Sequence, residues 1–266
     1  MGIITISRGS YSQGKEIAES VARRLGYECI SRELLLEASD HFNIPEVKLF
    51  TALHDAPSIL DRFHYGKERY LTFIQRTFLE HARHDNIVYH GLAGHVMLPG
   101  VGHCLAVRLV VNMEDRVRLK MDRENVSEEE ALRTLQEDDE GRRKWSLALW
   151  GKDPLALSLY DIMIHVRRLG VEDAAGLICR VAGYAGFRTT PESQKAVDDL
   201  FLAAQVRSQL VLEVPSCEVT ADAGLINVRV IAELTQEPEM TNEVKRLVQG
   251  VQGVKEIRVH VMPPGV

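Results

Sequence analysis

Residues 3–15 read Ile3-Ile4-Thr5-Ile6-Ser7-Arg8-Gly9-Ser10-Tyr11-Ser12-Gln13-Gly14-Lys15. The apolar run stops at Gly9, which indicates a buried strand that ends in a turn. Further on, Ile17, Val21 and Leu25 recur every four residues, so they form one stripe of a helix, and Gly26 stands where such a helix ends. The local order is therefore strand, glycine loop, helix.

This order gives the spacing G-x-x-x-x-G-K a physical meaning, because the N–H groups of such a loop and of the helix N-terminus can hold phosphate oxygens. The predicted phosphate-binding residues are Gly9, Ser10, Tyr11, Ser12, Gln13, Gly14, Lys15 and Glu16. Lys15 is expected to reach the outer phosphates and to take part in catalysis. The alternative is a glycine turn that caps a strand, with Lys15 as a solvated helix residue.

Composition bounds the class of protein. The chain has 266 residues, of which 45% are hydrophobic and 26% charged, as in a soluble globular protein, and its net charge is −6. This balance argues against general nucleic-acid binding, although local basic patches stay open. The four cysteines are far apart, which suits a reducing cytoplasm. No apolar run is long enough to span a bilayer, so we expect a cytoplasmic protein without a transmembrane segment.

Strand and helix patterns alternate along the first 180 residues. Strands are predicted near residues 27–30, 87–91, 104–112 and 161–166, and helices at 33–38, around 70–79, across the charged region 113–150, and at 171–178. Residues 40–70 look like a helical insertion. Such alternation predicts an α/β fold with a parallel sheet, and ligands bind at the carboxyl ends of its strands, where Gly9 and Gly91 both lie.

The composition changes near residues 186–193, which we interpret as a linker. Beyond it the pattern predicts a helix at 194–212, strands at 217–221 and 225–234, a helix at 239–249 and a strand at 255–261. The expected domains are residues 1–187, a linker at 188–194, and a small α+β domain at 195–266.

The first 180 or so residues resemble the cytidylate-kinase-like family of P-loop nucleotide kinases. The resemblance rests on the glycine loop and on four further segments that keep their order, residues 25–34, 86–91, 126–145 and 159–164. The C-terminal part resembles a BON domain, with Gly224 at its central turn and residues 251–257 as its closing element. The expected fold is thus a P-loop kinase-type parallel sheet flanked by helices, plus a BON-like α+β domain.

The resemblance implies an ATP-dependent kinase that uses Mg²⁺ and phosphorylates CMP, dCMP or a related small acceptor. It implies that Arg142, and with it Arg143, belongs to a lid that closes over the transferring phosphoryl group. Phosphoryl transfer needs positive charge around the equatorial oxygens, so the residue types suit this role. The alternative for both arginines is a solvated helix face among many acids.

Three positions depart from the family pattern. Ile17 stands where such kinases usually have a Thr whose hydroxyl binds magnesium, and Ser31 replaces an Asp. Leu92 stands where cytidylate kinases place an Arg that grips the acceptor. The predicted acceptor-binding residues are Arg32, Arg69 and Gly91, and Arg76 is a further candidate.

Other features stay open. Histidines 81, 84, 90 and 95 fit no standard zinc spacing, so no metal ligand is predicted. The BON-like domain is expected to be an accessory module for a ligand or a partner, and a homo-oligomer is an open alternative. A rival hypothesis makes the chain a non-catalytic, ATP-sensing regulator whose BON-like domain carries the function. A third hypothesis is a kinase of a small metabolite other than a nucleotide.

Overall fold

The computed structural model describes residues 2–31, 65–91 and 93–263. These residues form two compact units, which we describe one at a time. The first unit contains residues 2–31, 84–91 and 93–190, and the second contains residues 65–83 and 191–263. Helix α4 (Gly66–Ala82) thus belongs to the same unit as the C-terminal part of the chain.

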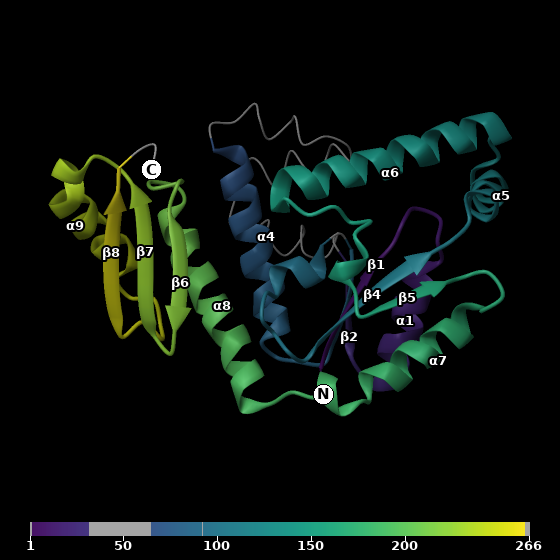
Figure 1. Ribbon diagram of the computed structural model, residues 1–266, viewed down its shortest axis with the longest axis horizontal. Helices are drawn as coiled ribbons and strands as arrows, with labels where there is room; N and C mark the ends of the chain where they lie inside the picture. Colours follow the sequence, from purple (N-terminus) through teal and green to yellow (C-terminus); the bar gives the residue numbers. More distant parts are fainter. Residues whose placement is uncertain (1, 32–64, 92, 264–266) are drawn as a thin grey trace. The chain divides into compact units, whose positions relative to one another are not determined.

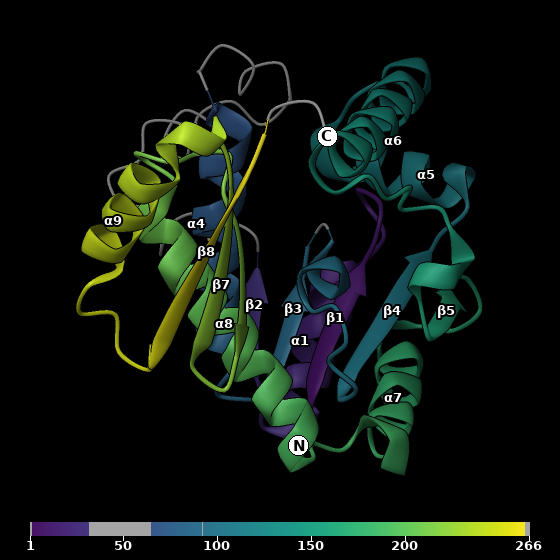
Figure 2. The same cartoon turned by 60° about the vertical axis from the view of Figure 1, so that its left-hand side comes forward.

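The first unit is built on a parallel sheet of five strands. The strands are β1 (Ile3–Ser7), β2 (Glu28–Ser31), β3 (Ile87–His90), β4 (Cys104–Val110) and β5 (Ile162–His165), in the spatial order β2-β3-β1-β4-β5 (Figure 2). Strand β1 lies in the middle of the sheet, with β3 and β2 on one side of it and β4 and β5 on the other. The carboxyl end of β1 is therefore the point where the strand order reverses, which is the usual ligand position in such sheets.

Two helices cover one face of this sheet, α1 (Gly14–Leu25) and α7 (Val171–Ala182). The apolar core between them is made of Ile4, Ile6, Val88, Val107, Leu109, Ile17, Val21, Ala174 and Ile178. The predicted stripe of α1 is confirmed, because Ile17 and Val21 are fully buried and Leu25 packs at the edge. Gly26 ends the helix with φ of 68°, the left-handed conformation that glycine adopts at low cost.

A helical hairpin follows β4 and consists of α5 (Met113–Glu124) and the long α6 (Glu128–Trp150) (Figure 1). The α6 helix begins after Ser127, whose hydroxyl accepts a hydrogen bond from the Glu130 amide at 3.2 Å. The hairpin has a small core of its own, formed by Val117, Ala131 and Leu135. We call α6 the lid helix, because it carries the predicted lid arginines.

The remaining elements of the first unit are short 3₁₀ turns. They are η3 (Gly94–Met97), η4 (Leu157–Leu159) and η5 (Ala185–Phe187). The η3 turn follows β3, and η4 lies in the segment that leads from the lid helix to β5. Both are close to the sheet end where the glycine loop lies.

The second unit has a sheet of three strands, β6 (Glu218–Asp222), β7 (Leu225–Ile231) and β8 (Glu256–Met262), in the order β6-β7-β8 (Figure 1). Strands β6 and β7 are antiparallel, whereas β7 and β8 are parallel. The helices α8 (Pro191–Leu210) and α9 (Glu237–Val248) accompany this sheet, and the short η6 (Leu234–Gln236) precedes α9. Its core includes Val206, Ile226, Val228 and Val244.

The predicted α/β order and the small C-terminal α+β unit are confirmed within one to three residues for most elements. Helix α8 begins at Pro191, so the last four residues of the predicted linker are helical. The helix expected at 33–38 and most of the helical insertion at 40–70 lie outside the described residues. Within the described ranges, no helix has the length and apolar character needed to cross a bilayer.

Candidate active site

The glycine loop connects Ser7, the last residue of β1, to Gly14, the first residue of α1. Two of its residues, Tyr11 and Gln13, have positive φ values of 53° and 55°. The Ser12 hydroxyl donates to the Gly9 carbonyl oxygen at 2.7 Å, which closes the turn from inside. The loop thus ends at a helix N-terminus, whose first N–H groups have no partner within the helix and can face an anion.

The side chain of Arg8 lies across the start of α1. A Cβ atom added to Gly14 would lie 1.9 Å from Arg8 Cδ, so position 14 accepts only glycine while Arg8 is in this place. Gly9 is approached in the same way, since its Cβ would lie 3.1 Å from Arg116 Cζ. The two glycines of the motif therefore let two arginines come close to the loop backbone.

Arg116, on α5, joins the loop to the lid helix. Its Nε donates to the Ser10 carbonyl oxygen at 2.8 Å, and its terminal nitrogens contact both carboxylate oxygens of Asp139 at 2.6 and 2.8 Å. The Arg116 side chain is only 7% exposed. Sequence reasoning missed this residue, because nothing in the pattern of α5 shows which of its arginines faces the loop.

A second set of contacts holds Tyr11 against α5. Lys120 Nζ lies 5.0 Å from the centre of the Tyr11 ring, and the Tyr11 hydroxyl contacts Glu124. Lys120 is mostly buried and forms an ion pair with Glu124 at 2.6 Å. The loop is therefore fixed at Ser10 and Tyr11 by one helix.

The two predicted lid arginines have different partners. Arg142 Nη2 lies 3.4 Å from the Ser10 hydroxyl, so the lid helix brings it to the glycine loop. Arg143 binds Asp153 with two contacts of 2.9 and 3.0 Å. This pairing raises the pKa of Arg143 and lowers the pKa of the Asp153 carboxyl. Arg142 is thus the arginine that reaches the loop.

The charged side chains of Lys15 and Glu16 are paired with residues outside the glycine loop. The Lys15 side chain is 67% exposed, and its Nζ lies 3.9 Å from Glu19, one turn further along α1. Burial would raise the pKa of Glu16, but the hydrogen bond from Arg123 at 2.9 Å and the charge of Arg8 lower it overall. Ile17 is a core residue with no exposed surface. None of Lys15, Glu16 and Ile17 carries a hydroxyl group that could bind Mg²⁺ beside the loop.

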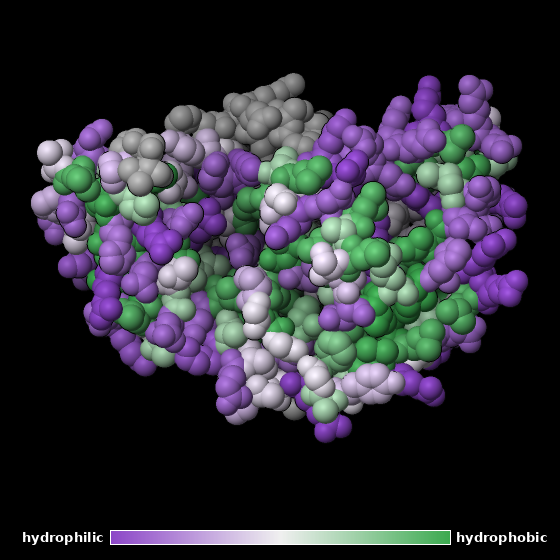
Figure 3. All heavy atoms as spheres, in the orientation of Figure 1, coloured by the Kyte–Doolittle hydropathy of each residue, from purple (hydrophilic) through white to green (hydrophobic). Residues whose placement is uncertain are grey.

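A cavity of about 530 Å³ opens beside the loop. Its cationic side is lined by Arg8, Arg108, Arg116, Arg142 and Arg143, together with Gly9 and Ser12 of the loop. Its apolar side includes Val110, Leu155 and Met163, and Figure 3 shows apolar side chains gathered at the surface over β4 and β5. A cavity of this size and mixed lining suits a ligand with a polyanionic and an apolar part.

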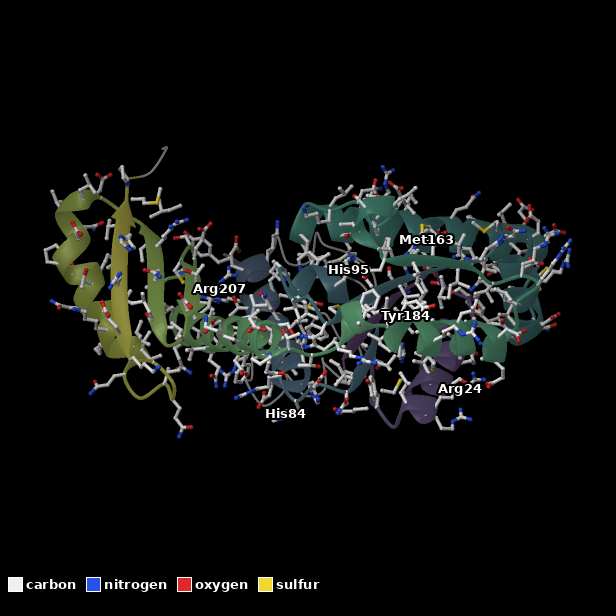
Figure 4. All side chains as sticks on the ribbon, turned by 60° about the horizontal axis from the view of Figure 1, so that its bottom comes forward. Arg24, His84, His95, Met163, Tyr184 and Arg207 are labelled. Atoms are coloured by element: carbon white, nitrogen blue, oxygen red, sulfur yellow. The ribbon has the colours of Figure 1, made fainter. Side chains whose placement is uncertain are left out.

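Arg108, which lines the cavity, also belongs to a polar cluster that the sequence did not indicate. Arg108 on β4 donates to the Ser7 hydroxyl at 2.9 Å, and the Tyr160 hydroxyl contacts the same Ser7 oxygen at 3.2 Å. His95, on η3, packs against the Tyr160 ring with 4.9 Å between ring centres. Burial, and to a lesser degree the charge of Arg108, lowers the pKa of His95 to about 4. His95 is therefore neutral near pH 7. Its side chain is labelled in Figure 4.

The predicted acceptor residues are only partly described. Gly91 lies at the end of β3, and its amide donates to the Ile6 carbonyl oxygen of β1 at 3.3 Å. Arg69 belongs to α4 in the second unit, as does Arg76, which donates to Ser208 at 2.7 Å. Arg32 and Leu92 lie outside the described residues, and their predicted roles stay predictions.

The donor set suits a polyphosphate better than a bare metal ion. Across residues 2–31, 65–91 and 93–263, no three His, Cys, Asp or Glu side chains gather as a metal site. Mg²⁺ usually keeps several waters and binds through substrate phosphates, so it needs no protein cage. The N–H groups at the start of α1 and the Arg142 guanidinium beside Ser10 are donors that suit phosphate oxygens.

A glycine loop at the carboxyl end of β1 and an arginine-lined cavity beside it are typical of an α/β protein that binds phosphate groups. The model of the Cytidylate kinase-like family matches residues 3–168. The chain belongs to this family. Membership supports kinase activity and, in general terms, the use of ATP and Mg²⁺.

Two relatives carry the name cytidylate kinase. The protein from Pyrobaculum islandicum is 27% identical over 190 residues, which cover 69% of this chain and 96% of that protein. The protein from Pyrobaculum aerophilum is 25% identical over 176 residues, covering 65% and 89%. The crystal structure of an uncharacterized protein from Eubacterium ventriosum aligns with a TM-score of 0.53 and 19% identity, covering 68% of this chain and 98% of that one. This last similarity supports the fold.

Proposed function

We propose that this protein is an ATP-dependent phosphotransferase of the nucleoside monophosphate kinase type, with CMP, dCMP or a related small molecule as acceptor. The observation that carries the proposal is the contact of Arg142 on the lid helix with Ser10 in the glycine loop. It places a guanidinium beside a helix N-terminus at the centre of the parallel sheet. The names of the two Pyrobaculum relatives support the choice of acceptor.

In the proposed reaction an acceptor oxygen forms a bond to the γ-phosphorus of ATP, and the bond to the bridging oxygen breaks to release ADP. Charge on the three equatorial oxygens is the main thing to stabilise. The loop amides would orient the donor phosphates, and Arg142 would stabilise the transferred group. Lys15 would have to turn from Glu19 toward the outer phosphates, a rotation that an exposed side chain can make. Arg116 connects the loop to the lid helix and so fixes their relative position.

The second candidate is a non-catalytic, ATP-sensing regulator whose C-terminal unit carries the function. The burial of Ile17 and the pairing of Lys15 with Glu19 favour it, because neither side chain serves the phosphates in this arrangement. The strand and helix order of the second unit is compatible with a BON-like accessory module for a ligand or partner.

The proposed domain limits stay 1–187, 188–194 and 195–266. We propose a cytoplasmic location, with a homo-oligomer as an open alternative.

One experiment separates these candidates. ADP release from ATP and Mg²⁺ is measured with CMP, dCMP, UMP and AMP in turn, and Lys15→Ala and Arg142→Ala serve as site variants. Acceptor-stimulated release that both variants reduce supports the kinase. The four nucleotides are then replaced by small metabolites that are not nucleotides. ATP binding without release by any acceptor of either set supports the regulator, and release only with the second set supports a kinase of another small metabolite.

A further inference from the structure

Among the described arginines that line the cavity, Arg108 alone lies on a strand of the five-stranded sheet. It lies on β4 directly beside Ser7 of β1, with which it is paired in the sheet register. Its Nη1 donates to the Ser7 hydroxyl at 2.9 Å. Ser7 is the residue just before the glycine loop, so the guanidinium lies at the root of that loop.

Tyr160 completes the support of this guanidinium. Arg108 Cζ lies 6.0 Å from the centre of the Tyr160 ring, and the Tyr160 hydroxyl is 2.9 Å from the Pro154 carbonyl oxygen and 3.2 Å from Ser7 Oγ. A carbonyl oxygen can only accept, so the single Tyr160 hydroxyl proton goes to Pro154. The Ser7 hydroxyl then donates to Tyr160 and accepts from Arg108, which fixes all three groups.

Arg108 forms no ion pair with a carboxylate within the described residues. Arg116 and Arg143, on the same cavity, are paired with Asp139 and Asp153. Arg108 is partly buried and lies close enough to His95 to affect its titration, as does the charge of Asp161 in the opposite direction. A guanidinium that is partly buried, oriented by hydrogen bonds and not in an ion pair is typical of a site that receives an anion.

We propose that Arg108, held in place by Ser7 and Tyr160, binds the phosphate of the acceptor, a nucleoside monophosphate. This inference rests on the proposed function, in which the loop and Arg142 hold the ATP phosphates. Two phosphate groups must then approach each other within one cavity, and separate cations for donor and acceptor reduce their repulsion. In this family an Arg that binds the acceptor is expected at position 92, where this chain has Leu92. Arg108 would supply the positive charge that is missing there.

The test compares Arg108→Ala and Arg108→Gln with Arg118→Ala. Glutamine keeps a donor for the Ser7 hydroxyl without the charge, and it covers the case in which the alanine variant fails to fold. Arg118 is a matched control, because it is 76% exposed on α5 and faces Asp115. Binding of the ATP analogue AMPPNP with Mg²⁺ is measured by calorimetry, followed by binding of CMP, dCMP, UMP and AMP to the protein saturated with AMPPNP.

Both Arg108 variants are expected to weaken monophosphate binding roughly tenfold to a hundredfold, with AMPPNP affinity within about threefold of the parent. Tyr160→Phe keeps the ring and removes the hydroxyl, so it should give a smaller loss. The inference is overturned if the Arg108 variants match Arg118→Ala, if AMPPNP binding falls equally, or if the parent binds AMPPNP and no monophosphate. Failure of the parent to bind AMPPNP instead counts against the proposed function.

Discussion

Arg116 and Asp139 face each other as a two-pronged ion pair, with nitrogen–oxygen distances of 2.6 and 2.8 Å. The remaining Nε of Arg116 donates to the Ser10 carbonyl oxygen. One guanidinium thus connects three segments that are distant in sequence: the glycine loop, α5 and the lid helix. The geometry of the loop depends on a helix that follows it by about a hundred residues.

Arg116→Ala should lower the stability of the first unit by about 1–3 kcal/mol, because it leaves the Ser10 carbonyl and the Asp139 carboxylate without their partner. The thermal unfolding midpoint measures this loss. Arg118→Ala removes an exposed arginine from the same helix and should change stability by less than about 0.5 kcal/mol. Equal effects of the two variants would contradict the bridging role of Arg116.

Neighbouring lid arginines should respond differently to substitution. Arg142→Ala is expected to lower kcat roughly 10²- to 10³-fold, the loss typical of one donor that stabilises the transition state. Arg143→Ala should cost less than about tenfold, because Arg143 is committed to Asp153. Steady-state kinetics on the best acceptor of the panel measures both. A larger loss of kcat in Arg143→Ala than in Arg142→Ala would mean that the lid helix rotates before phosphoryl transfer and brings Arg143 to the transferred group.

Ile17→Thr tests whether position 17 can recover a magnesium hydroxyl. Ile17 is fully buried against the sheet, so the new hydroxyl should enter the core and destabilise the protein by about 1–3 kcal/mol beyond its loss of volume. Ile17→Val is the matched control and should cost about 0.5–1.5 kcal/mol. We expect the Mg²⁺ dependence of ADP release to stay unchanged, and a lower Mg²⁺ requirement in the threonine variant would contradict this.

His95 should make the stability of the first unit depend on acidity. Its pKa is about 4 in the folded chain and 6.5 when exposed, so the unfolded state takes up a proton first as the pH falls. The stabilisation that comes from keeping His95 neutral is complete above pH 6.5. Between pH 6.5 and pH 4 the free energy of unfolding falls by about 1.4 kcal/mol per pH unit. Unfolding in urea at several pH values measures this slope.

His95→Phe keeps a ring against Tyr160 and should flatten the slope. Asp161 acts in the opposite direction to Arg108 on His95, so it reduces the shift without reversing it. His165→Asn removes an exposed histidine that contacts Asn112 at 2.9 Å and serves as the control. An unchanged slope in His95→Phe would show that another group titrates.

The strand, loop and helix at the start of the chain could be predicted because they depend on local pattern: an apolar run, two glycines and a stripe of Ile17 and Val21. Arg108 and Arg116 could not be found this way. Their roles depend on β4 pairing beside β1 and on α5 folding back over the loop, and both are long-range arrangements. In the sequence, each looks like an ordinary charge in its own element.

Lys15 illustrates the opposite limit. Its place in the motif predicts a phosphate contact, yet the spacing does not decide the rotamer of an exposed side chain, and Glu19 lies one turn away on the same helix. Its role stays a prediction. Arg142 was predicted only through the family resemblance, and the structure brings it to Ser10.

The position of Arg8 over Gly14 changes what a standard test of the motif measures. An alanine at position 14 is usually read as a block to the incoming phosphate. Here its methyl group would first displace the Arg8 side chain, so a loss of activity would have two causes. Pairing Gly14→Ala with Arg8→Ala separates them: restored binding in the double variant would identify crowding between the two side chains as the defect, with the anion still able to enter.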